Sequence, residues 1–164
     1  MIVAVADAGP IIHLGEVDAL DLLEVVDELL IRETVRGELE EGGVPRGLTD
    51  LDFETVAAGD EQEFGSGLDE GETAALTVAA DRDAVLLTDD LAAREAATDA
   101  DVDVHESIGV ITLAFSRGEV TEEQAVGLMR SLQTETSLFV TDAVVEHGIE
   151  MLREAGGTAD QSDS

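Results

Sequence analysis

A short apolar run at the start of the chain constrains its fold more than any other feature. Residues 2–6 are five consecutive small or branched apolar residues, and Asp7 ends the run. Such a run is typical of a β-strand that is buried on both faces, as in a parallel sheet. Gly9-Pro10 then indicates a turn into a helix, because proline is tolerated in a first helical turn. Open α/β sheets bind ligands where their strands end, so Asp7 is a candidate functional residue.

Strand and helix patterns alternate along the rest of the chain. Further strands are predicted at 29–31, 53–56, 84–88 and 102–104, and helices at 8–14, 19–26, 32–41, 69–80, 91–97, 108–117, 122–132 and 142–154. The segment 44–68 has the weakest pattern. The alternation predicts a three-layer α/β/α domain with a central, mainly parallel sheet and a helical C-terminal extension.

The expected domain covers residues 1–155, a length that can bury a substantial core. Residues 156–164 are polar and acidic, and we expect them to form a disordered tail. The apolar faces of the helices predicted at 108–117 and 122–132 fit either the core or a surface through which two chains pair.

The charge of the chain is extreme. It has 39 acidic residues and 8 basic ones, all arginine, for a formal net charge of −31. With 44% hydrophobic residues it can still bury a core, so the charge does not indicate disorder. At about 1 M salt the screening length falls to roughly 3 Å, which would relieve the repulsion. The composition resembles that of proteins from halophilic archaea, and we interpret the charge as a salt adaptation rather than as evidence about partners.

The chain contains no cysteine, which excludes disulfides, thiolate metal sites and a cysteine nucleophile. Its first apolar run has no basic region before it and is far too short for a signal peptide or a membrane span. These features predict a cytoplasmic protein that does not associate with membranes.

Four acids occupy positions that a solvated surface acid would not need. Asp7 and Asp90 each follow an apolar strand, and Glu38 borders the apolar stripe of its helix. Glu72 lies at helical spacing before apolar residues, which places it on a buried face. Clustered carboxylates need a cation, and an all-oxygen donor set suits Mg²⁺ or Mn²⁺. Such a metal can activate water and stabilise the charge that develops when a phosphodiester is cleaved.

Each acid also has a purely structural interpretation. Asp7 could cap the helix that follows it, and Asp89 or Asp90 could cap the helix from residue 91. Residues 69–72 have the spacing of a capping box, so Glu72 could serve the helix terminus alone. Glu38 could be an ordinary flanking residue of a very acidic protein.

Two further residues near Asp90 have open roles. Thr88 could be a strand-end hydroxyl without function. Arg94 could be the i+4 ion-pair partner of Asp90, or it could reach a phosphate. The three histidines lack the spacing of metal ligands, and we interpret them as structural or surface residues: His13, His105 and His147.

The order of four motifs resembles that of the PIN domain. These are Val-Ala-Asp-Ala-Gly-Pro-Ile-Ile-His-Leu at 5–14, Val-Arg-Gly-Glu at 35–38, Gly-Glu-Thr-Ala-Ala at 71–75 and Leu-Leu-Thr-Asp-Asp-Leu-Ala-Ala-Arg at 86–94. More narrowly, they are similar to the branch of VapC-like toxin components, including its C-terminal extension near 107–118. The resemblance covers roughly residues 2–155.

The resemblance implies a parallel-sheet nuclease whose acids bind Mg²⁺ or Mn²⁺ and direct water at RNA. By motif, the catalytic and metal-binding acids would be Asp7, Glu38, Glu72 and Asp90, with Thr88, Asp89 and Arg94 as candidate supporting residues. It further implies a toxin held inactive by a cognate antitoxin protein, and a homodimer is a further candidate. Many relatives carry Ser or Thr where this chain has Ala8 and Gly9, and the chain has no lysine for phosphate contacts.

Two other functions are candidates besides this one. A catalytically weak or inactive PIN-like module would bind RNA or protein without cleaving it. A phosphoacceptor receiver domain also gathers acids at strand ends beside a threonine, but it requires a lysine that this chain lacks.

Overall fold

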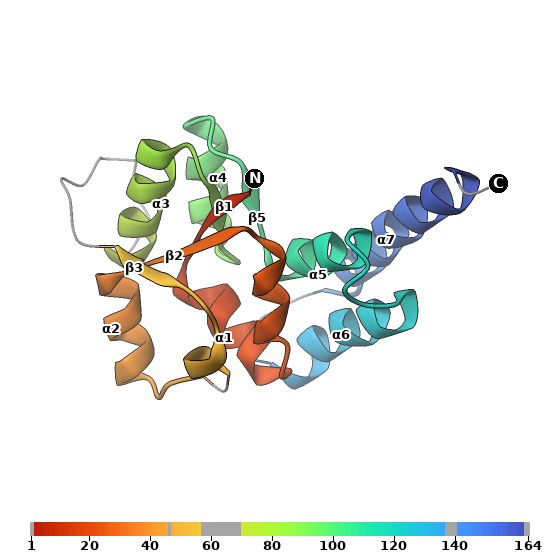
Figure 1. Ribbon diagram of the computed structural model, residues 1–164, viewed down its shortest axis with the longest axis horizontal. Helices are drawn as coiled ribbons and strands as arrows, with labels where there is room; N and C mark the ends of the chain where they lie inside the picture. The colour runs from red at the N-terminus through yellow and green to blue at the C-terminus, as the bar shows by residue number, and fades with distance from the viewer. Residues whose placement is uncertain (1, 46, 57–69, 137–140, 163–164) are drawn as a thin grey trace.

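Five parallel strands form the central sheet of the computed structural model, which describes residues 2–45, 47–56, 70–136 and 141–162 (Figure 1). The strand order is β3-β2-β1-β4-β5, and every neighbouring pair is parallel. The strands are β1 (Val3–Ala6), β2 (Glu28–Arg32), β3 (Glu54–Val56), β4 (Val85–Leu87) and β5 (Val104–His105). The opening apolar run is therefore the central strand, and the predicted three-layer fold is confirmed.

Nine helical segments connect and cover the described strands. They are α1 (Ala8–Glu16), η1 (Leu20–Val25), α2 (Glu33–Glu41), η2 (Leu48–Asp50), α3 (Glu70–Arg82), α4 (Leu91–Asp99), α5 (Ser107–Ser116), α6 (Glu122–Glu135) and α7 (Asp142–Ser162). The segments η1 and η2 are 3₁₀-helices, a form common in short connections. The helix predicted at 19–26 therefore corresponds to η1, and its type was not specified by the sequence pattern.

The alternation of side chains along β1 divides the core into two clusters. Val5 faces one side, where it packs with residues of α3 and α4 such as Leu76 and Ala97. Ala4 and Ala6 face the other side, where a larger cluster includes residues of α1, α5, α6 and α7. Both faces of β1 are fully buried, which explains why its sequence has no polar alternation.

The C-terminal helices pack together at one end of the molecule, beside α1 and η1 (Figure 1). Their apolar faces belong to the core, because Ile111, Met129 and Leu132 are fully buried. Helix α7 continues to Ser162, beyond the end predicted at residue 154, so most of the segment predicted as a disordered tail is helical here. Extending an existing helix requires no new nucleation, which favours this continuation. None of the described helices has the length and apolar character needed to cross a membrane.

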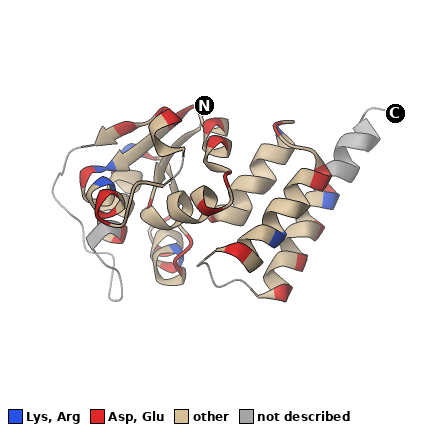
Figure 2. Ribbon diagram, turned by 90° about the horizontal axis from the view of Figure 1, so that it is seen from below, with Lys and Arg blue, Asp and Glu red and all other residues tan. Residues whose placement is uncertain are grey.

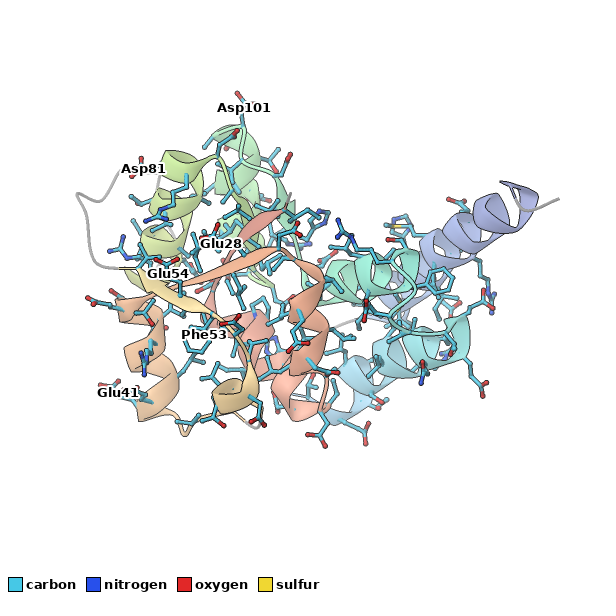
Figure 3. All side chains as sticks on the ribbon, viewed as in Figure 1. Glu28, Glu41, Phe53, Glu54, Asp81 and Asp101 are labelled. Atoms are coloured by element: carbon cyan, nitrogen blue, oxygen red, sulfur yellow. The ribbon has the colours of Figure 1, made fainter. Side chains whose placement is uncertain are left out.

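Acidic residues are distributed over most elements, while basic residues are few (Figure 2). Glu41, Asp81 and Asp101 are exposed and lie at the periphery of the molecule (Figure 3). This distribution agrees with the interpretation that most of the acids are solvated surface charges.

A close contact of α7 with α5 and α6 gives a test of this packing. A Cβ atom at Gly148 would lie 2.9 Å from Cγ2 of Ile108 and 3.2 Å from Sδ of Met129. We expect Gly148→Ala to lower the free energy of unfolding by about 1–3 kcal/mol because it overpacks this contact. Gly127→Ala in α6 is the matched control, because a Cβ there would meet no atom within 4 Å. It should stabilise the protein by about 0.5–1 kcal/mol. Equal changes in urea unfolding of the two variants would contradict the packing.

Candidate active site

A cavity of about 250 Å³ lies at the carboxyl edge of the sheet. The four acids singled out from the sequence all line it, from the ends of β1 and β4 and from helices α2 and α3. The described lining residues are Asp7, Ala8, Gly9, His13, Glu38, Glu72, Thr88, Asp89 and Asp90. The fold therefore brings together on one cavity acids that are far apart in the sequence.

Asp7 is fixed by the junction of β1 and α1. Its side chain is the N-cap of α1, with Oδ1 accepting a hydrogen bond from the Ala8 amide at 2.9 Å. Its Oδ2 accepts a hydrogen bond from the Thr88 hydroxyl at 3.1 Å. Asp7 is only 6% exposed and Thr88 only 1%. The capping interpretation is thus correct, but it does not exclude a metal role, because an ionised carboxylate has about four acceptor sites.

Asp90 is fixed by the junction of β4 and α4. It is the N-cap of α4, and its Oδ2 accepts a hydrogen bond from the Ala93 amide at 2.9 Å. Its own amide donates to the Thr88 hydroxyl oxygen at 3.3 Å. Thr88 therefore connects Asp7 to Asp90 and holds the ends of β1 and β4 in a defined relation.

Glu38 and Glu72 reach the cavity from two packed helices, α2 and α3. Glu38 is exposed, whereas Glu72 is half-buried. Glu72 precedes the buried residues Ala75 and Leu76 at i+3 and i+4, on the same helix face. Residue 69 lies outside the described residues, so the predicted capping box at 69–72 is untested.

Arg94 does not pair with Asp90 through its side chain. Its Nη1 instead donates to Oε2 of Glu106, the N-cap residue of α5. This ion pair links α4 to the start of α5, and Arg94 is not among the residues that line the cavity.

Asp89 has different partners from those of its neighbour Asp90. Its Oδ1 accepts a hydrogen bond from the Ser107 amide at 2.7 Å, and its Oδ2 accepts one from the Ser107 hydroxyl at 2.6 Å. Nδ1 of His13 lies 2.7 Å from the same Oδ2. Asp89 therefore holds the first turn of α5 and a side chain of α1 against the β4–α4 connection. His13 lines the cavity, so the interpretation that it is merely structural or at the surface missed its position.

The donor set of the cavity fits a hard divalent cation in its chemistry. It offers carboxylate oxygens, and no lysine or arginine is among the described lining residues. However, no three imidazole or carboxylate groups of the described residues lie close enough together to hold an ion as they stand. The described acids therefore share a cavity without forming a preassembled coordination shell.

A buried arginine at the end of β2 was not anticipated as part of this region. Arg32 is 1% exposed, and its Nε and Nη2 atoms are buried without a hydrogen-bond partner. It is the last residue of β2 and the N-cap residue of α2, at the helix start predicted from the sequence. It lies two residues after Leu30, so it shares the strand face of Leu30, which belongs to the cluster on the α3 side of the sheet. Its positive charge therefore lies within the fold at the edge of the sheet where the acids gather.

The fold and the acid-lined cavity define a PIN domain. The sequence profile of the PIN domain family matches residues 3–154, so the chain belongs to this family. A similar solved structure is a PilT N-terminus domain protein from the hyperthermophilic archaeon Sulfolobus solfataricus, with a TM-score of 0.58 and 17% identity. The match covers 73% of this chain and 97% of that one, and it supports the fold alone. A comparison with curated proteins finds no match.

Family membership confirms the broader part of the resemblance. PIN domains are commonly metal-dependent nucleases that act on nucleic acid. The narrower expectations, namely a VapC-like toxin, RNA as substrate, the choice of Mg²⁺ or Mn²⁺ and a halophilic source, stay predictions.

Proposed function

We propose that this chain is a metal-dependent endoribonuclease that hydrolyses RNA phosphodiester bonds. The observation that carries the proposal is that Asp7, Glu38, Glu72 and Asp90 line one cavity of a PIN domain. When bound by these carboxylates, Mg²⁺ or Mn²⁺ would supply charge stabilisation and activation of water.

The residues around the cavity have separable tasks in this proposal. Asp7 and Asp90 are held by helix termini and by Thr88, so their carboxylates are oriented before any ligand arrives. Such preorganisation reduces the reorganisation needed at the moment of reaction. Glu38 and Glu72 come from helices and complete the acidic donor set.

An acidic surface would repel RNA unless ions intervene. The formal net charge is −31, and only eight arginines offer direct contacts to phosphate. At about 1 M salt, charges more than roughly 3 Å apart are largely screened. We therefore propose that the protein works in concentrated salt, in the cytoplasm of a halophilic host.

We further propose that the activity is controlled by a partner protein. The resemblance to VapC-like toxins supports a cognate antitoxin that covers the acidic cavity, with a homodimer as a candidate assembly. A small antitoxin-like reading frame beside the gene would support this regulation, and a free-standing gene would contradict it.

One observation favours a second candidate function, a module that binds RNA or protein without cleaving it. No three of the described acids lie close enough together to hold an ion. If the cavity never closes on a cation, the acids would serve the structure only, as the helix caps at Asp7 and Asp90 already do.

A cleavage assay distinguishes the two functions. The purified protein is incubated in molar KCl with a labelled single-stranded RNA, with Mn²⁺, Mg²⁺ or a chelator. We expect endonucleolytic products with either metal and none with the chelator. Intact RNA under all conditions, while the protein is folded by circular dichroism, would favour the non-catalytic module.

A further inference from the structure

His13 and Asp89 form a buried pair at the wall of the cavity. Nδ1 of His13 lies 2.7 Å from Oδ2 of Asp89, and their side chains are only 14% and 6% exposed. Asp89 is itself immobilised by two hydrogen bonds from Ser107, which is fully buried. Gly9 packs against both side chains, since a Cβ there would lie 3.7 Å from Cε1 of His13 and 3.7 Å from Cβ of Asp89. The imidazole ring of α1 is therefore held against the β4–α4 connection by Asp89, which Ser107 of α5 fixes in turn.

This contact determines which ring nitrogen carries the hydrogen. An ionised carboxylate only accepts hydrogen bonds, so Nδ1 must be the donor to Asp89. In the neutral imidazole the other nitrogen, Nε2, then has a lone pair and can only accept. A carboxylate that orients a histidine through Nδ1 also stabilises the imidazolium when Nε2 takes up a proton.

His13 lines the cavity, and no hydrogen bond from a described residue reaches its Nε2. This nitrogen therefore keeps its capacity to accept a hydrogen bond. The carboxylates of the cavity would be occupied by a cation in the proposed function. Among the described lining side chains, His13 is the only imidazole.

We propose that His13, positioned by Asp89, is a catalytic residue that accepts a proton from the water attacking the RNA phosphodiester. This proposal rests on the proposed function and adds a residue to it. The water oxygen forms a bond to phosphorus while the bond from phosphorus to one ribose oxygen breaks. One proton of the water passes to Nε2, and the departing ribose oxygen takes a proton from solvent. The imidazolium, stabilised by Asp89, then returns its proton to solvent, so the net change is the addition of one water molecule.

The variant His13→Asn separates this role from a structural one. The Asn amide nitrogen lies near the position of Nδ1 and can still donate to Asp89, but nothing replaces Nε2. We expect kcat to fall by about 10²- to 10⁴-fold, the usual contribution of general acid–base catalysis, with little change in KM. Mn²⁺ affinity and the unfolding midpoint should stay near those of the wild type. His147→Asn, at an exposed position on α7, is the matched control and should leave kcat unchanged.

A second measurement does not depend on activity. The ¹⁵N chemical shifts of the imidazole in the metal-free protein identify the tautomer. We expect His13 to carry its hydrogen on Nδ1, and this preference to weaken in Asp89→Asn. A wild type with the hydrogen on Nε2, or a His13→Asn variant with wild-type kcat, would overturn this proposal and leave the proposed function intact. A wild type without cleavage would instead refute the proposed function and the catalytic role of His13 with it, whatever the tautomer.

Discussion

Asp7→Asn is expected to lower the rate of metal-dependent RNA cleavage by at least about 100-fold, since even residues that only support metal ligands typically contribute 10- to 100-fold. The substitution removes one negative charge from the cavity and leaves a single carbonyl oxygen in place of the carboxylate. It does not remove the helix cap, because Asn caps a helix N-terminus as well as Asp does. The variant therefore distinguishes a metal ligand from a helix cap at Asp7. The hydrogen bond from Ala8 is compatible with both roles.

The matched control for this experiment is Asp99→Asn. Asp99 is an exposed acid at the end of α4. Its substitution by asparagine removes the same charge as Asp7→Asn does, but outside the cavity. Its cleavage rate should equal that of the wild type. If Asp7→Asn cleaves RNA normally while both variants are folded, Asp7 serves only as a cap and the metal assignment fails for it.

Asp89→Ala is expected to lower the free energy of unfolding by about 3 kcal/mol, because hydrogen bonds to a charged group are individually strong and their buried donors would lose their partner. Two of the lost bonds come from Ser107, at the first turn of α5, and the third contact is with Nδ1 of His13. For a chain of this size the change corresponds to a fall in Tm of roughly 6–12 °C. Thermal unfolding in molar KCl, followed by circular dichroism, measures it.

Asp90→Ala, at the neighbouring position, is expected to affect the cleavage rate far more than the stability. Asp90 is exposed, and its side chain caps α4 through one hydrogen bond from the Ala93 amide, so its loss should lower the free energy of unfolding by only about 1 kcal/mol. Its cleavage rate should nevertheless fall as far as that of Asp7→Asn. Equal losses of stability in Asp89→Ala and Asp90→Ala would contradict the separate roles assigned to these two adjacent acids.

The sequence predicted the central features of the fold because they depend on local patterns. The apolar run at 2–6 is typical of a strand buried on both faces, and it contains the central strand, β1. The acids at its end and at the end of the strand near 86 meet because parallel strands share a carboxyl edge. The four acids therefore line one cavity as anticipated, although their role as metal ligands stays a prediction.

Features that depend on distant contacts could not be predicted. His13 and Asp89 are 76 positions apart, and no spacing rule connects them. Two adjacent acids at 89–90 are equivalent in sequence, and only the fold shows that one binds Ser107 while the other caps α4. Arg32 lies at the predicted helix start, as the N-cap residue of α2, but nothing local indicates that its charged side chain is buried.

The most direct test of the central claim is a calorimetric titration of the wild-type protein with Mn²⁺ in molar KCl. Four carboxylates on one cavity should bind the ion saturably, in a defined stoichiometry, and the affinity of Asp7→Asn should be at least about tenfold weaker. Performing the titration at high salt screens the many surface acids, so that only a true site gives a saturable signal. No saturable binding by the folded wild-type protein would contradict the metal site and leave the acids as helix caps and surface charges.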